Sequence, residues 1–87
     1  MLKIEKEITI NSEQGLHARP AALFVQLANK FDCEIIVRKG SNTVSGKSIM
    51  GILMLAAERG SKLIISAEGE DAQKAVEELG NFLGGVS

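Results

Sequence analysis

The sequence predicts an α+β fold, a two-layer open-faced β-sandwich in which three helices cover one face of a four-stranded antiparallel sheet. Its 87 residues suit one domain, spanning 1–87. The spacing of apolar residues changes along the chain between that of a strand and that of a helix, in the order β-α-β-β-α-β-α. The expected strands mostly show one apolar face, so a single covering layer of helices is sufficient.

The first strand and the first helix are distinguished by this change of spacing. A strand is expected over residues 2–10, where apolar side chains alternate with polar ones and only Lys6 interrupts the pattern. Residues 11–15 form a loop, and helical spacing begins at Ala18. Pro20 fits the first turn of this helix, because an N–H there would have no partner in the helix. The apolar positions of the helix are Ala21, Phe24, Val25, Ala28 and Phe31.

Three further strands follow from composition and alternation. The β-branched run at 34–39 predicts a strand, 39–42 a turn and 43–45 a short return strand, which together form a hairpin. A fourth strand is expected over 62–67. Its apolar face contains Leu63, Ile65 and Ala67.

Two more helices complete the layer. The second is expected over 49–59, with Ser48 as its N-cap and Gly60 as its stop. Asp71 leads the third helix, whose apolar stripe faces the sheet. This stripe contains Ala72, Ala75, Val76, Leu79, Phe82 and Leu83.

Composition and charge argue against several classes of protein. Ten basic and eleven acidic residues give a net charge of -1, whereas general nucleic-acid binders carry a basic excess. The one cysteine, Cys33, cannot form an internal disulfide, and its place before the apolar run at 35–37 favours a packing role. A free thiol fits the reducing cytoplasm, and no run suits a membrane span or a signal peptide. We therefore expect a soluble, cytoplasmic protein with no membrane insertion.

The stretch EQGLHARPAALF, residues 13–24, contains the only histidine and the only proline of the chain. It lies at the expected start of the first helix, where unpaired N–H groups and a partial positive charge attract anions. Gly15 allows the loop to bend closely, and Arg19 adds a guanidinium that suits phosphate oxygens. His17 is expected to be neutral in this field, with a ring nitrogen free to attack an electrophile. These residues could hold a phosphoryl group, but taken alone they are equally compatible with an ordinary surface histidine.

Longer strings in the sequence resemble a known family. GLHARPAALFVQLANKF (15–31) closely resembles the signature of HPr, the histidine-containing phosphocarrier family of the bacterial phosphoenolpyruvate:sugar phosphotransferase system. GKSIMGILML (46–55) is similar to the second signature of that family, and ISAEGEDAQKAVEEL (65–79) to the end of its pattern. The resemblance covers all 87 residues, and the fold that it implies is the open-faced sandwich expected above.

The resemblance implies a role for each residue of the first signature. His17 would accept phosphate at its δ nitrogen from enzyme I, which phosphoenolpyruvate charges, and would pass it to an EIIA domain. Arg19 would contact the phosphoryl oxygens, and the N–H groups around Ala18 and Arg19 would cap them. The protein would then be a substrate of its partners and not an enzyme, with no cofactor and no metal. A carrier that visits several partners is expected to be a monomer.

The second helix is apolar on nearly all sides. Ile52, Leu55 and Ala56 would suffice to pack it on the sheet, and a two-layer domain of this size cannot easily bury the rest. The remaining apolar residues are either the edge of the core or a docking surface with adaptable methionines. The resemblance implies docking of enzyme I and its acceptors here. The residues concerned are Ile49, Met50, Leu53 and Met54.

Ser48 has two compatible interpretations. As an N-cap, its oxygen accepts a backbone N–H of the second helix. In the resemblance it aligns with the regulatory serine that HPr kinase/phosphorylase phosphorylates. A phosphate there would place up to two negative charges beside the docking surface and disfavour binding of enzyme I. The resemblance would assign the new acidic epitope to a catabolite-control repressor.

The chain departs from the family pattern at two places. Relatives commonly have glycine where Ala56 stands, and alanine is expected to prolong the helix toward Gly60. The tail GGVS (84–87), interpreted as frayed, lacks the charges of many relatives' tails. A contact between the terminus and Arg19 is therefore not expected.

Three alternative functions are weighed against the carrier. A regulatory or nitrogen-branch HPr paralogue would signal by phosphorylation without feeding sugar transport, but purely regulatory relatives often lose the histidine that this chain retains. A small nucleic-acid-binding domain would need a basic face and stacking aromatic residues, which are missing. A hydrolase with His17 as its base would need a nucleophile or a pair of acids, and no Ser, Cys or acid pair stands near it in the sequence, although a partner distant in the sequence could supply one.

Overall fold

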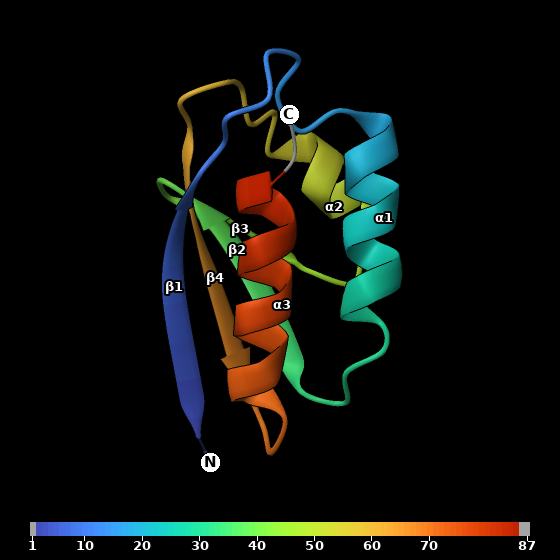
Figure 1. The fold of residues 1–87 in the computed structure, drawn as a ribbon, viewed down its shortest axis with the longest axis vertical. Coiled ribbons are helices and arrows are strands. Elements are labelled where there is room, and N and C mark those ends of the chain that lie inside the picture. Colours follow the sequence, from blue (N-terminus) through green and yellow to red (C-terminus); the bar gives the residue numbers. More distant parts are fainter. Residues whose placement is uncertain (1, 86–87) are drawn as a thin grey trace.

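The computed structural model describes residues 2–85, and its elements follow the predicted order. They are β1 (Lys3–Thr9), α1 (Ala18–Ala28), β2 (Glu34–Lys39), β3 (Asn42–Ser45), α2 (Ile49–Met54), β4 (Lys62–Glu68) and α3 (Ala72–Gly85). The strands form one antiparallel sheet in the order β1-β4-β2-β3. Figure 1 shows the three helices together on one face of this sheet, and α1 contacts both α2 and α3. The predicted two-layer open-faced sandwich is confirmed. In residues 2–85 no helix is both long and apolar enough to cross a membrane.

The core lies between the sheet and the helices, because every second side chain of the strands points toward the helical layer. β2 buries Ile35 and Val37, and β4 buries the three predicted residues of its apolar face. The two strands pair through Ile35 with Ala67 and through Val37 with Ile65, so their buried faces coincide. The largest fully buried side chains are Phe24, Ile35, Ile52, Leu63, Ile65, Leu79, Leu83 and Val37.

The first strand is shorter and less buried than predicted. Leu2 precedes the first pair of the ladder, Lys3 with Glu68, and is 53% exposed. Of the apolar residues at its alternating positions, Ile8 and Ile10 are buried, whereas Ile4 is only partly buried. The predicted half-buried face is therefore limited to the later part of this edge strand.

The first and third helices bury most of their predicted apolar stripes. In α1, Ala21, Phe24 and Ala28 are buried, whereas Phe31 is buried beyond the end of the helix and Val25 is partly buried. In α3 every predicted residue is buried except Phe82, which is partly buried. Gly84 and Gly85 belong to α3, so the predicted fraying of the tail is wrong for these two residues. Residues 86–87 lie outside the described part of the chain.

Asp71 joins the start of α3 to the segment between α1 and β2. Its carboxylate accepts the N–H of Asp32 at 2.8 Å and the N–H of Cys33 at 3.0 Å. The bond from Asp32 contributes most to holding the pKa of Asp71 below its ordinary value. Cys33 is buried, as the sequence predicted for a packing residue. Burial, with Asp71 beside it, raises the pKa of the Cys33 thiol to about 11.

The second helix ends at Met54, so the predicted end near Gly60 is wrong. The N–H of Leu55 donates to Ile52 at 3.2 Å and the N–H of Ala56 to Leu53 at 3.1 Å, which tightens the last turn. Ala56 then adopts a left-handed conformation with φ 49°, so it does not prolong the helix. Leu55 is buried, as predicted, but Ala56 is exposed and does not pack on the sheet. The tertiary structure at this turn has overridden the helix propensity of alanine.

Candidate functional site

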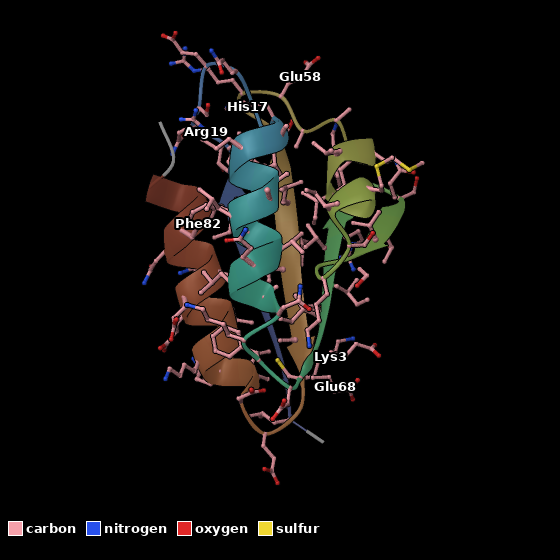
Figure 2. The ribbon with its side chains drawn as sticks, turned by 90° about the vertical axis from the view of Figure 1, so that its right-hand side faces the viewer. Lys3, His17, Arg19, Glu58, Glu68 and Phe82 are labelled. Carbon is pink, nitrogen blue, oxygen red and sulfur yellow. The ribbon has the colours of Figure 1, made fainter. Side chains whose placement is uncertain are left out.

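His17 is the N-cap of α1, with extended backbone angles and an exposed side chain. Figure 2 shows His17 and Arg19 at one end of the molecule, away from Lys3 and Glu68 at the other. The carbonyl of His17 accepts the N–H of Ala21 at 3.0 Å, which starts the helix. Pro20, the third helical residue, is buried and has no N–H. The first turn therefore places the histidine in solvent at the positive end of α1.

Two N–H groups of this first turn are available to an anion. Among residues 2–85 the structure gives neither the N–H of Ala18 nor that of Arg19 a hydrogen-bond acceptor. Both belong to exposed residues directly after His17. Unpaired donors at a helix N-terminus bind phosphate oxygens well, because the helix dipole adds to each hydrogen bond. These N–H groups lie where the sequence predicts an anion site, which stays a prediction.

The loop before His17 is fixed by backbone contacts. Gly15 has φ 70°, and a Cβ at this position would lie 2.5 Å from the carbonyl oxygen of Ala57. The N–H of Leu16 donates to that same oxygen at 2.8 Å, and the side chain of Leu16 is buried. The N–H of Gly15 donates to Ser12 at 3.0 Å. The predicted close bend at Gly15 is therefore present, and it is a close approach of two backbone segments.

The imidazole of His17 has one polar contact with the loop. Its Nδ1 lies 3.2 Å from the carbonyl oxygen of Gly15. A carbonyl only accepts, so this contact is a hydrogen bond when Nδ1 carries the proton. The neutral ring then has its lone pair on Nε2. A reaction at Nδ1 requires the proton to leave that nitrogen and this hydrogen bond to break.

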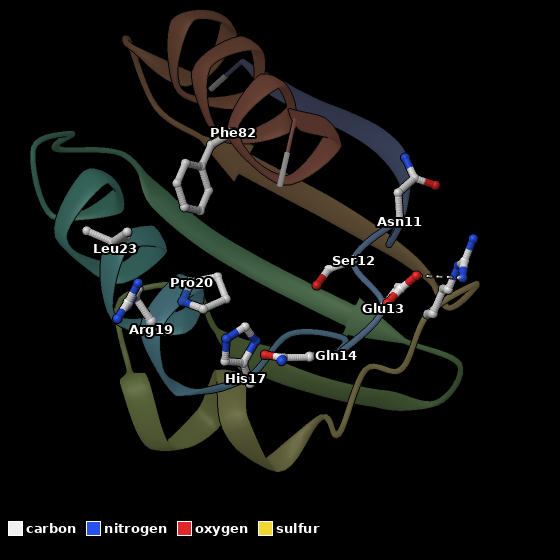
Figure 3. Close-up of a pocket in the computed structure, with 10 residues that line it drawn as sticks. Asn11, Ser12, Glu13, Gln14, His17, Arg19, Pro20, Leu23 and Phe82 are labelled. Atoms are coloured by element: carbon white, nitrogen blue, oxygen red, sulfur yellow. Dashed lines mark ion pairs between the residues drawn. The ribbon is translucent and has the colours of Figure 1, made fainter. Parts of the chain in front are cut away.

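A pocket of about 660 Å³ lies beside the imidazole, as Figure 3 shows. His17 and Arg19 both line it, and Leu23 and Phe82 contribute apolar surface from α1 and α3. Arg59 also lines the pocket, 4.0 Å from Glu13, in an exposed ion pair that adds little stability. The residues that line the pocket are Asn11, Ser12, Glu13, Gln14, His17, Arg19, Pro20, Leu23, Arg59 and Phe82.

Sequence reasoning missed the distant members of this pocket. Arg59 is the last residue of the helix predicted over 49–59, and Phe82 belongs to the predicted apolar stripe of the third helix. Nothing in the local pattern links either residue to His17, because the fold alone brings them together. Gln14 lies inside the stretch 13–24, and its side-chain amide is an uncharged hydrogen-bonding group at the pocket. The described residues form no group of three or more His, Cys, Asp or Glu side chains that could hold a metal ion.

The second helix presents apolar side chains to solvent close to this site. Ile49 is 41% exposed, Met50 63% and Met54 75%, whereas Leu53 is partly buried against the core. The Oγ of Ser48 accepts the N–H of Gly51 at 3.1 Å, which confirms the predicted N-cap. Figure 1 shows α2 beside the first half of α1, so both predicted surfaces lie toward one end of the molecule.

The model of the family described as "PTS HPr component phosphorylation site" matches residues 4–84. The chain belongs to the HPr family of phosphocarriers. It is 46% identical to the HPr-like protein Crh of Halalkalibacterium halodurans over 80 residues. This alignment covers 92% of this chain and 95% of the relative. The crystal structure of the phosphocarrier protein HPr from Bacillus anthracis has a TM-score of 0.89 at 46% identity, covering 93% and 96% of the two chains. The crystal structure of Crh from Bacillus subtilis, a dimer with a swapped domain, has a TM-score of 0.75 at 40% identity, with 92% of each chain covered.

The HPr fold of this chain brings His17, Ala18 and Arg19 together and places Ser48 apart from them. Arg19 lines the same pocket as His17, and the N–H of Ala18 lies next to both in the chain. Ser48 belongs to a separate position, at the start of α2, and does not line that pocket. The exposed histidine with its nearby N–H donors and the exposed apolar surface of α2 are thus two separate features.

Proposed function

We propose that His17 is the phosphoryl acceptor of a phosphotransferase system, charged by enzyme I and discharged to EIIA domains. The observation that carries this proposal is the exposed imidazole at the start of α1, next to the unoccupied N–H groups of Ala18 and Arg19. A carrier must release its phosphate to the next protein, so an open site is more suitable than a closed pocket. The partners supply the remaining chemistry.

Transfer at Nδ1, which the resemblance to the HPr family implies, requires a change of tautomer of the ring. The proton of Nδ1 is released from its bond with the Gly15 carbonyl, and the ring is then protonated at Nε2 instead. The lone pair of Nδ1 forms a bond to phosphorus while the bond between phosphorus and the donor breaks. The Arg19 guanidinium and the two free N–H groups stabilise the negative charge on the phosphoryl oxygens. Transfer to the acceptor reverses these steps.

A labelling experiment tests the proposal. The protein is incubated with enzyme I and phosphoenolpyruvate, and the phosphate bound to it is assayed for stability in acid and in base. We expect an acid-labile, base-stable phosphate that is absent from the His17→Ala variant. Label that persists in this variant, or no label in the unchanged protein, would contradict the assignment.

The exposed apolar residues of α2 are proposed as the docking surface for enzyme I and its acceptors. Ile49, Met50 and Met54 are supported by their exposure, whereas Leu53 contributes only the part that the core leaves accessible. Methionine side chains adapt to different partners because they are flexible and polarizable. Docking here would bring the partner to the end of the molecule that carries His17.

Ser48 is proposed as a regulatory phosphorylation site for HPr kinase/phosphorylase. Its Oγ is already hydrogen-bonded to Gly51, and the exposed Ile49 and Met50 follow it directly. A phosphate would bring up to two negative charges to an apolar docking surface, which opposes docking of enzyme I and offers an acidic epitope to a catabolite-control repressor. Incubation with HPr kinase and ATP should label the protein but not Ser48→Ala. Equal labelling of the two would remove the proposal.

A regulatory paralogue is the second candidate, since one similar protein is named HPr-like protein Crh. The carrier is preferred because the chain retains His17 in an exposed position. We further propose a cytoplasmic monomer. Because Crh has been solved as a dimer, a dimer of this chain is the alternative to the monomer. Light scattering at the protein concentration of the assay distinguishes monomer from dimer.

A further inference from the structure

The turn that follows α2 contains a strained residue. Ala56 has φ 49° and is the single non-glycine residue with a positive φ between residues 2 and 85. A side chain with a Cβ is unfavourable in this left-handed region, which glycine commonly occupies at the end of a helix. The 55–57 turn, comprising Leu55, Ala56 and Ala57, therefore needs stabilisation from elsewhere in the fold.

Lys39 supplies such a contact from the end of β2. Its Nζ donates to the carbonyl of Leu55 at 3.2 Å and to the carbonyl of Ala56 at 3.1 Å. These carbonyls follow the last turn of α2, where a cation is favourable because helix carbonyls lack partners. Lys39 is partly buried and pairs with Asn42 across the hairpin, so its backbone is fixed by the sheet.

The same turn holds the loop that carries the histidine. The carbonyl of Ala57 accepts the N–H of Leu16 at 2.8 Å, and Leu16 directly precedes His17. Both side chains are anchored, since Leu16 is 7% exposed and Ala57 4%. A shift of the 55–57 turn would therefore move or release the backbone at Leu16.

We propose that Lys39 is a positioning residue for phosphoryl transfer at His17: its ammonium group holds the strained 55–57 turn, and that turn holds the histidine loop. The structural half of this proposal is that Lys39 holds the turn, and the functional half is that this contact supports phosphoryl transfer. Only the functional half rests on the proposed function of His17. The contact also explains how Ala56 can occupy a left-handed position. With Lys39 removed, the strain at Ala56 would favour opening of the turn.

Hydrogen exchange tests the structural half in the full chain. Lys39→Met keeps the aliphatic stem and removes the ammonium group, and we expect the amide proton of Leu16 to exchange about tenfold faster. Adding Ala56→Gly removes the strain and should return this rate close to its original value. Lys62→Met, at an exposed position of β4, is the matched control and should change nothing. If Lys39→Met instead accelerated all amides of β4 and Leu16 equally, the effect would be global and the proposal wrong.

Phosphoryl transfer from enzyme I tests the functional half. Lys39→Met should lower kcat several-fold, and the double variant with Ala56→Gly should recover it. A loss that Ala56→Gly does not restore would show that Lys39 acts on the partner, which would overturn the positioning role. If the unchanged protein accepts no phosphate at all, the proposed function fails, while the exchange rates still decide whether Lys39 holds the turn.

Discussion

Replacement of Gly15 by alanine tests how the histidine loop is held. Gly15 has φ 70°, and the added Cβ would lie 2.5 Å from the carbonyl oxygen of Ala57 and 3.0 Å from the Cα of Glu58. The left-handed conformation costs a residue with a Cβ about 1–2 kcal/mol. The clash also separates the N–H of Leu16 from the Ala57 carbonyl, and a lost backbone hydrogen bond costs about 0.5–1.5 kcal/mol. We therefore expect a loss of about 2–3 kcal/mol in the free energy of unfolding.

A second glycine provides the control for this prediction. Gly40 has φ 59°, but a Cβ there meets no atom within 4 Å. Gly40→Ala thus carries the conformational cost alone, about 1–2 kcal/mol. In a domain of this size the additional loss in Gly15→Ala should lower Tm by a further several degrees, about 4–8 °C for each kcal/mol.

Urea unfolding and thermal melting measure both variants, and transfer from enzyme I measures the effect on His17. Gly15→Ala should be less stable than Gly40→Ala and should also slow transfer, because the backbone before His17 has moved. If the two variants lose equal stability and both transfer phosphate normally, the contact between Gly15 and Ala57 does not position the loop.

Three further predictions concern Arg19, Met54 and Asp71. Arg19→Ala should slow transfer about tenfold, because a charge-assisted bond to the phosphoryl group is lost, with an unchanged circular dichroism spectrum; an unfolded variant would show that Arg19 is structural. Met54→Asp should raise KM for the reaction with enzyme I while changing stability by less than about 0.5 kcal/mol, since Met54 is 75% exposed; an unchanged KM would exclude Met54 from the docking surface. The pKa of Asp71 is lowered from its ordinary value of 3.8 by N–H donors, so its contribution to stability is complete above that pH and is lost as pH falls through the lower folded-state pKa. Asp71→Asn should therefore flatten the decline of the urea midpoint below about pH 4, and an unchanged decline would contradict this assignment.

The fold could be predicted because its strands and helices carry local signals. The β-branched run predicted β2 with its observed bounds, and Ser48 caps α2 as expected. The end of α2 could not be predicted in this way. Alanine favours a helix locally, whereas the observed turn at Ala56 depends on Lys39, 17 residues earlier, and on burial of Ala57 by the packed fold.

The candidate site was predictable where its residues are consecutive. Gly15, His17 and Arg19 lie in one stretch, so the start of a helix alone places them together. Arg59 and Phe82 reach the same pocket from the segment before β4 and from α3, and only the assembled sheet and helices show this. Exposure of Met50 and Met54 was predictable because a short helix in two layers cannot bury every side, but the partial burial of Leu53 required the packed structure.

Nuclear magnetic resonance of the phosphorylated protein tests the central claim most directly. With ¹⁵N labelling, the account predicts that phosphorus is bound to Nδ1 of His17 and that the amide resonances of Ala18 and Arg19 shift most, because their free N–H groups then bind the phosphoryl oxygens. Phosphate on another residue, or amide shifts that leave the first turn of α1 unchanged, would contradict it.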